Sequence, residues 1–324
     1  MTEQQVITWL LERDNFLLLT HVRPDGDTLG SASALCRSLN KAGKTAYLLR
    51  NPGVTRTFDG WLTLPWAPDG WEPEHVIAVD IATEKLFPDG EQQKYLGKTE
   101  LCIDHHPSNE HYAQNLCLDP EAAAAGEVVY TICKGLGNLD EEMAKALYIA
   151  ISTDCGCFVY SNTRPQSHRI AAELMELADM SAINKHFFQT KSSKELGLQA
   201  RLMNSLAFFE DGKVCIGTVT VADKAALNAD ESDCEELSSF AATIEGVLCA
   251  ATIRELEPNQ CKVSLRTTPS YANANHICNR MGGGGHPAAS GATLPYPTTV
   301  EEARKIVYQA IFHIIKGEAL ASNP

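Results

Sequence analysis

Two histidines follow an aspartate where a short apolar run ends, at Asp104, His105 and His106. The apolar residues 101–103 before them and Pro107 after them are typical of a buried strand that ends at the rim of a parallel sheet. Ligands of open α/β sheets gather at that carboxyl edge. Two imidazoles beside a carboxylate can bind a divalent metal and leave one ring for a substrate. For these three residues alone, a turn with two ordinary histidines is the alternative.

A second cluster, His21, Asp25 and Asp27, has the spacing HxxxDxD directly after another apolar run. Three such ligands within seven residues converge only if the backbone turns sharply, which Pro24 and Gly26 permit. The alternative is a solvated Asp-Gly turn. The spacing therefore indicates a candidate metal-binding loop.

Two further aspartates stand where predicted elements end: Asp80 closes an apolar strand, and Asp154 follows a helix rich in Ala, Ile and Leu. Each alone is equally consistent with a helix cap or a turn. Four aspartates packed together with histidines would repel strongly unless cations neutralised them. We therefore expect two divalent metal ions. Mixed His and Asp ligands favour manganese, cobalt or zinc over magnesium or calcium, with manganese first because oxygen donors predominate.

Near the C-terminus, four glycines precede His286 and Pro287. Without Cβ atoms, a glycine run lets backbone N–H groups close around an anion, and His286 adds a donor. Arg266 ends a predicted strand and could clamp a phosphate. A flexible turn and a surface arginine are the alternatives. The predicted substrate-binding residues are Arg266, Gly283, Gly284, Gly285 and His286.

Strands alternate with helices through the first half of the chain, which predicts an α/β fold with a doubly wound, mainly parallel sheet. A smaller α+β domain follows, across a cleft. The expected domains are 1–185 and 199–324, with a linker at 186–198. Predicted strands span 15–22, 44–50, 75–80, 101–104, 214–220, 246–255 and 262–267; predicted helices span 28–43, 126–136, 141–152, 165–178, 192–209, 272–281 and 300–316.

Composition limits the classes of partner. The 324 residues carry a formal net charge of −14, which argues against a long nucleic-acid footprint because that needs a basic stripe. No apolar run approaches membrane-spanning length, and the first residues lack the pattern of a secretory signal. Eleven cysteines without CxxC pairs fit reduced thiols. We expect a cytoplasmic protein that binds no membrane.

Taken in order, HxxxDxD, Asp80, the DHH triplet, the STD sequence at 152–154 and GGGGHP resemble the DHH–DHHA1 phosphoesterase superfamily. Within it, the chain is similar to the NrnA-like group of nanoRNases and pAp phosphatases. The resemblance covers nearly the whole chain, including SNT at 161–163 and SLR at 264–266. It implies two manganese sites, the first held by His21, Asp25 and Asp80 and the second by Asp27, Asp80, His105 and Asp154.

The resemblance also implies that Asp104 orients His105 and that His106 faces the phosphoryl group as a donor or general acid. Arg266 and the glycine loop with His286 would hold the substrate. The implied reaction is hydrolysis of short oligoribonucleotides and of 3′-phosphoadenosine 5′-phosphate (pAp) by metal-activated water. The alternatives are a cyclic-dinucleotide or pApA phosphodiesterase and a non-catalytic nucleotide-binding regulatory module. A manganese pyrophosphatase is disfavoured, because that activity needs a second domain lined by lysine and arginine rather than a glycine run. A homodimer is also left open.

Overall fold

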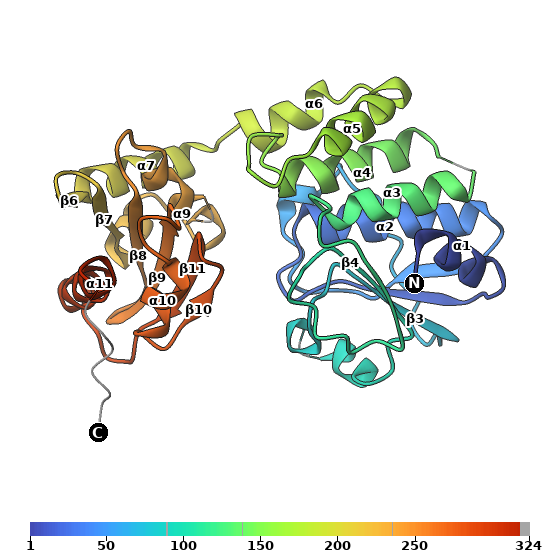
Figure 1. The fold of residues 1–324 in the computed structure, drawn as a ribbon, viewed down its shortest axis with the longest axis horizontal. Helices are drawn as coiled ribbons and strands as arrows, with labels where there is room; N and C mark the ends of the chain where they lie inside the picture. The colour runs from blue at the N-terminus through green and yellow to red at the C-terminus, as the bar shows by residue number, and fades with distance from the viewer. Residues whose placement is uncertain (89, 138, 235, 318–324) are drawn as a thin grey trace. The chain divides into compact units, whose positions relative to one another are not determined.

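The computed structural model describes residues 1–317 apart from 89, 138 and 235, and it divides into two compact units, Met1–Thr190 and Lys191–Pro324 (Figure 1). The predicted boundaries at 185 and 198 stay predictions. Residues 318–324 of the predicted second domain lie outside the described part of the chain.

The first unit contains a five-stranded sheet and a layer of helices. Its strands are β1 (Phe16–Leu19), β2 (Ala46–Leu48), β3 (His75–Val79), β4 (Leu101–Asp104) and β5 (Asn115–Leu118). Its α-helices are α1 (Glu3–Leu11), α2 (Gly26–Lys41), α3 (Ala125–Gly135), α4 (Glu141–Asp154), α5 (Pro165–Leu177) and α6 (Ser181–Asn184). Short 3₁₀ segments lie at Arg56–Phe58, Glu84–Leu86 and Glu91–Tyr95, and a π-helical turn lies at Lys185–Gln189.

The sheet has the strand order β2-β1-β3-β4-β5, and every pairing is parallel. This confirms the predicted α/β class. The chain moves outward from β1 to β2 and then crosses back to β3 on the other side of β1. In open α/β sheets, ligands bind beyond the carboxyl ends of the strands at such a reversal. The topology therefore points to the ends of β1 and β3.

The two faces of this sheet are covered differently. Phe16 and Leu18 of β1 pack into the core that the α-helices form, with α2, α3 and α4 in mutual contact over that face (Figure 1). Leu17 and Leu19 face the opposite core, which the irregular segments after β2 and β3 supply through residues such as Phe87. Strand residues buried on both faces explain the continuous apolar runs of the sequence.

The second unit is built on a six-stranded mixed sheet in the order β10-β11-β9-β8-β7-β6, in which β7 and β8 pair in parallel. Its strands are β6 (Ala207–Phe209), β7 (Val214–Val219), β8 (Cys249–Glu257), β9 (Gln260–Thr267), β10 (Gly284–Gly285) and β11 (Ala289–Thr293). Its helices are α7 (Ser193–Ser205), α8 (Val221–Ala226), α9 (Leu237–Phe240), α10 (Ala274–Asn279) and α11 (Val300–Ile315), with 3₁₀ turns at Ser232–Cys234 and Ala241–Thr243. The mixed sheet confirms the predicted α+β character.

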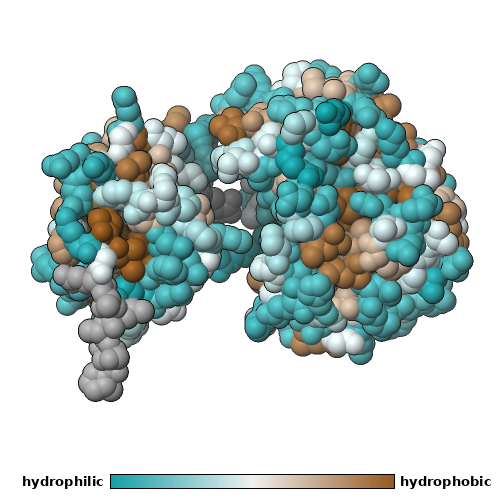
Figure 2. All heavy atoms as spheres, viewed as in Figure 1, coloured by the Kyte–Doolittle hydropathy of each residue, from teal (hydrophilic) through white to brown (hydrophobic). Residues whose placement is uncertain are grey.

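The surfaces of both units mix hydrophilic side chains with smaller hydrophobic areas on the face that Figure 2 shows. All eleven cysteines are free thiols, and all but Cys157 are buried. Over the described residues, each helix is too short or too polar to cross a lipid bilayer.

Candidate metal centre

Three neighbouring strands deliver polar residues to one edge of the first sheet. His21 lies two residues after β1, Asp80 directly follows β3, and Asp104 is the last residue of β4 and is followed by His105. Because β1, β3 and β4 are adjacent and parallel, their carboxyl ends meet. The strand order thus brings together residues that lie as far as 84 positions apart in sequence (105 − 21).

Two helices complete the cluster. Asp25 caps α2 by accepting hydrogen bonds from the backbone N–H groups of Asp27 and Thr28, at 3.1 and 3.2 Å. A Cβ added to Gly26 would lie 2.2 Å from Thr153 Oγ1, so the first turn of α2 contacts the last turn of α4 closely. This contact requires glycine, and it places Asp25 and Asp27 next to Asp154.

Among the described residues, the potential ligand atoms form three groups, and within each group they lie within 4.8 Å of one another. The groups are His21, Asp25 and Asp80; Asp27, His105 and Asp154; and Asp80, His105 and His106. His105 Nε2 lies 3.7 Å from Asp27, 3.6 Å from Asp80 and 3.6 Å from Asp154. His21 Nε2 lies 3.6 Å from Asp25 and 3.7 Å from Asp80.

These separations are too long for hydrogen bonds but suit donors that share a cation. Ligands at about 2.1 Å from one divalent ion stand roughly 3 to 3.6 Å apart. Imidazole nitrogens with carboxylate oxygens are a donor set for first-row divalent metals. The residues therefore fit a metal centre, and Asp80 belongs to two of the three groups.

Asp80 has an unusual side-chain environment and an unusual backbone conformation. The residue is 3% exposed, and its Oδ1 is buried and has no hydrogen-bond partner in the part of the chain that the structure describes. Its backbone φ is +59°, in the left-handed region that residues other than glycine rarely adopt. Unpaired buried carboxylate oxygens and strained backbone both concentrate at functional sites. A divalent cation held at this edge would give this oxygen a partner.

Burial and mutual repulsion oppose full ionisation of the cluster. Burial, and next the nearby charge of Asp154, raise the pKa of Asp27 to about 7. Burial raises the pKa of Asp154 to about 6, with His105 opposing the shift. Burial and repulsion from Asp27 raise the pKa of Asp80 well above its usual value. Carboxylates arranged in this way are stabilised in their charged form by bound cations.

The two adjacent histidines have different hydrogen-bond partners. His105 Nδ1 lies 3.1 Å from the Ala122 carbonyl oxygen, which leaves Nε2 facing the aspartates. His106 Nδ1 lies 2.8 Å from Asp104 Oδ1. The expectation that Asp104 orients His105 is therefore wrong. Asp104 Oδ1 accepts from the backbone N–H of His105 and also contacts the ring of His106, so among the two imidazoles it is the His106 ring that this carboxylate orients.

Several residues that support the cluster were not predicted. The Asn109 side chain donates to Asp104 Oδ2 at 2.6 Å. The backbone N–H groups of Ala125 and Gly126 donate to the two oxygens of Asp27, at 2.7 and 2.9 Å. Asn51 donates to the carbonyl oxygen of His21 at 2.8 Å. The run of small residues at 122–126 is the one sequence signal that could have identified this support, because it permits the start of α3 to approach Asp27.

The substrate-binding residues predicted for the second unit lie around β9, β10 and β11. Arg266 on β9 pairs with Ala289 of β11, and the glycine run forms β10 at the edge of the sheet. The Gly283 N–H donates to the Cys278 carbonyl oxygen at 2.9 Å, and the Gly285 N–H donates to the Asn275 side chain at 3.1 Å.

These bonds engage the N–H groups of Gly283 and Gly285 within the unit, and anion binding by the backbone of the run stays a prediction. The His286 N–H is also engaged, by the Ala289 carbonyl oxygen at 2.9 Å. A Cβ on Gly283 would lie 2.1 Å from the Gly291 carbonyl oxygen, so this glycine is needed for close packing against β11. The side chain of His286 is exposed, and that of Arg266 is half-buried.

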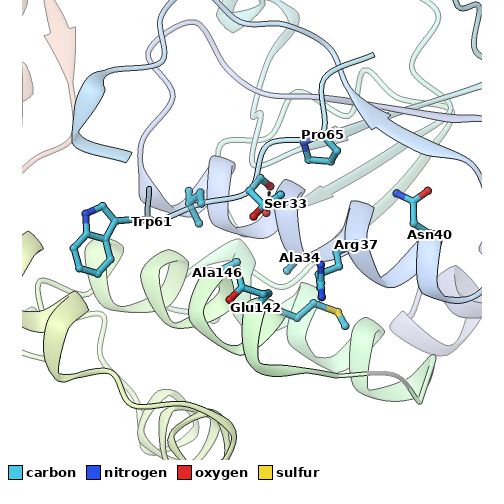
Figure 3. A pocket seen from close by; sticks show the side chains of 11 residues that line it. Ser33, Ala34, Arg37, Asn40, Trp61, Pro65, Glu142 and Ala146 are labelled. Atoms are coloured by element: carbon cyan, nitrogen blue, oxygen red, sulfur yellow. Dashed lines mark hydrogen bonds between the residues drawn. The ribbon is translucent and has the colours of Figure 1, made fainter. Parts of the chain in front are cut away.

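A cavity of about 140 Å³ lies elsewhere in the first unit, between α2, α4 and residues 61–65 (Figure 3). Trp61, Arg37 and Met143 are among its lining residues, and Arg37 is held by Asp140 at 3.0 Å. None of the lining residues belongs to the aspartate and histidine cluster. The cavity is therefore separate from the candidate metal centre.

Known protein families match a region in each of the two units. A family model described as "DHH family, N-terminal domain" matches residues 15–151, and a model of the DHHA1 domain matches residues 211–312. The bifunctional oligoribonuclease and PAP phosphatase NrnA of Thermus thermophilus is 29% identical over 282 residues, which cover 86% of this chain and 83% of the relative. A Streptococcus mutans protein named as a probable bifunctional oligoribonuclease and PAP phosphatase NrnA is 28% identical over 312 residues, covering 94% and 96%.

Among solved structures, an exopolyphosphatase-related protein from Bacteroides fragilis superimposes with a TM-score of 0.85 at 22% identity. The match covers 97% of this chain and 96% of that one. At this level of identity, the likeness shows a shared fold, and it does so over nearly the whole chain.

Proposed function

This chain belongs to the DHH family of phosphoesterases and carries the DHHA1 domain as well, and from that premise we propose that it hydrolyses short oligoribonucleotides to mononucleotides and pAp to AMP. The names of the two relatives describe both activities in those proteins. The observation that carries the proposal to this chain is the buried carboxylate of Asp80. Its Oδ1 has no hydrogen-bond partner among the described residues, and the residue belongs to two groups of potential metal-binding atoms.

The proposed cofactor is a pair of divalent cations, with manganese first. His21, Asp25 and Asp80 would hold one ion, and Asp27, Asp80, His105 and Asp154 the other. When bound, such ions lower the pKa of water and stabilise charge on phosphoryl oxygens. The preference for manganese rests on a donor set in which carboxylate oxygens outnumber imidazole nitrogens.

His106 is proposed to act on the phosphoryl group. Its Nδ1 is bonded to the fully buried carboxylate of Asp104, which fixes the orientation of the ring. The same carboxylate accepts a hydrogen bond from Asn109, so the pair is held rigidly. The ring nitrogen left for the substrate is Nε2, which serves as the donor to a phosphoryl oxygen or to the leaving group.

Substrate capture is proposed for Arg266 and His286 of the DHHA1 domain. A guanidinium group can donate two parallel hydrogen bonds to one phosphate, and the exposed imidazole adds a third donor. The net charge of −14 supports a preference for short substrates, because a long RNA needs many cations along its path.

The test is a manganese-supplemented assay of the full chain on pAp, pApA, dinucleotides, longer RNA and pyrophosphate. We expect hydrolysis of pAp and of RNAs of a few nucleotides, with rates that fall sharply as the RNA lengthens. Undiminished degradation of long RNA would contradict the length preference. Hydrolysis of pApA without activity on pAp or other dinucleotides would favour the pApA phosphodiesterase alternative, and binding without turnover the regulatory-module alternative.

A further inference from the structure

The turn that follows Asp154 has an unusual backbone. Gly156, Cys157 and Phe158 have φ values of +56°, +53° and +66°, three consecutive residues in the left-handed region. Glycine adopts this conformation readily, but a bulky side chain such as that of Phe158 does so at a cost in strain. Strain of this kind persists only where the surroundings fix it, and it clusters at functional sites.

The surroundings do fix this turn. The Phe158 N–H donates to Cys155 Sγ at 3.3 Å, and the Cys157 N–H donates to the Ser152 carbonyl oxygen at 2.7 Å. The ring of Phe158 stacks on the imidazole of His168 with centroids 5.0 Å apart. The turn is therefore a rigid part of the fold.

The turn presents two apolar side chains to solvent. Val159 is 81% exposed and Tyr160 is 56% exposed. A Cβ added to Gly156 would lie 2.4 Å from a ring atom of Tyr160, so the ring packs against the backbone of Gly156. The aromatic ring is thus supported on one side and accessible on the other.

This surface is connected directly to the metal centre. Gly156, which supports the Tyr160 ring, is two residues after Asp154. The Asn162 side chain donates to the carbonyl oxygens of Asp154 and Ala123, at 3.2 and 3.1 Å. The residue before Ala123 provides the carbonyl oxygen that faces His105 Nδ1. The turn and the ligands therefore hold fixed positions relative to one another.

We propose that Tyr160, flanked by Val159, is a platform on which the nucleobase of the substrate stacks. This rests on the proposed function and deepens it, because it assigns recognition of the base to the catalytic domain. Proteins that act on single-stranded nucleic acid hold bases on aromatic rings, and such stacking tolerates any base. A substrate phosphate bound near Asp154 would bring its own base within reach of this ring.

The test compares kcat/KM for pAp with kcat/KM for the same bisphosphate lacking adenine, in the manganese-loaded full chain. Tyr160→Leu keeps an apolar side chain on Gly156 but removes the aromatic face, and we expect the ratio of the two values to fall roughly tenfold. Tyr160→Phe keeps the aromatic face and should leave the ratio at its wild-type value. Met175→Leu, at a position on α5 that is also 56% exposed, is the matched control. An unchanged ratio in a normally folded Tyr160→Leu overturns the platform.

A binding measurement separates this proposal from the proposed function. Titration calorimetry with AMP and with ribose 5-phosphate reports base recognition without turnover. We expect wild-type protein to bind AMP more tightly and Tyr160→Leu to lose that preference. If the wild type hydrolyses neither bisphosphate, the proposed function fails while this preference still supports the platform. Equal wild-type affinities for the two ligands overturn the platform whatever the activity.

Discussion

At the carboxyl edge of the first sheet, side chains that follow β1, β3 and β4 converge with side chains of α2 and α4, and Asp80 Oδ1 has no hydrogen-bond partner among the described residues. In the glycine run of the second unit, by contrast, the N–H groups of Gly283 and Gly285 are bonded within that unit. Both regions carry conspicuous motifs. The difference is that side chains at strand ends take no part in pairing the strands, whereas backbone N–H groups bonded within a unit help to hold its fold together. Substitutions in the candidate metal centre should therefore affect catalysis, and substitutions in the glycine run should affect stability.

The largest effect is expected for Asp80→Asn. Loss of the shared carboxylate should lower kcat for pAp on the order of a thousandfold, because metal-ion stabilisation supplies several kcal/mol. In metal-free protein the same change should raise the melting temperature, since it removes a buried carboxylate from its like-charged neighbours. Asp69→Asn, in an exposed turn, is the control. Near wild-type turnover with manganese would refute the assigned centre.

Asp104→Asn should lower kcat about a hundredfold, with little change in KM, because outer partners of a reactive imidazole fix its orientation. The amide can offer only one oxygen to the donors from His106 and Asn109 that the carboxylate accepts on two. The measurement is steady-state hydrolysis of pAp. A kcat within twofold of wild type would show that Asp104 serves the fold alone.

In the second unit, Gly283→Ala should destabilise the chain by about 2 kcal/mol, because the new Cβ overlaps the Gly291 carbonyl oxygen. Gly284→Ala is the matched control: its Cβ would meet Asn275 and Asn279 at an ordinary 3.5 Å, so the change in unfolding free energy should be within about 0.5 kcal/mol. Chemical denaturation measures both. If Gly284→Ala instead weakened substrate binding at unchanged stability, the run would bind the substrate directly.

The smallest effect is expected for Arg266→Ala, which should raise KM for pAp about tenfold, since a charge-assisted hydrogen bond to phosphate is lost. A generic aryl phosphodiester should be affected less. Arg201→Ala, a half-exposed arginine on α7 of the same unit, is the control. Equal losses on both substrates would count against substrate capture by Arg266.

The sequence predicted four of the five strands of the first sheet because buried parallel strands leave continuous apolar runs, and the fold brings the candidate ligands together in groups. β4 was predicted at 101–104, as observed, and the residues after it are the ones that join the metal groups. β5 was not predicted, because only Cys117 of its four residues is buried and the strand depends on pairing with β4. β11 was also missed, since Ala289–Thr293 consists of small residues with weak strand preference.

The partners of individual side chains were harder to predict. That Asp104 bonds to His106 depends on the direction of each ring in the turn after β4, which spacing does not determine. Support from Asn109, Ala122 and Asn162 comes through the tertiary fold, because each is brought to the cluster by the path of a loop. Asparagines and backbone carbonyl groups occur in every loop, so only the structure identifies the ones that support the cluster.

The hydrogen bonds of Asp27 decide which aspartate should be replaced to make an inactive but folded protein. Its two oxygens accept from Ser31 of α2 and from the Ala125 and Gly126 N–H groups at the start of α3, so one carboxylate fastens two helices together. An asparagine there would turn an NH₂ group toward a donor and loosen that junction. Asp154, with 31% of its side chain exposed at the end of α4, is the safer position for a variant meant to trap substrate in an intact protein.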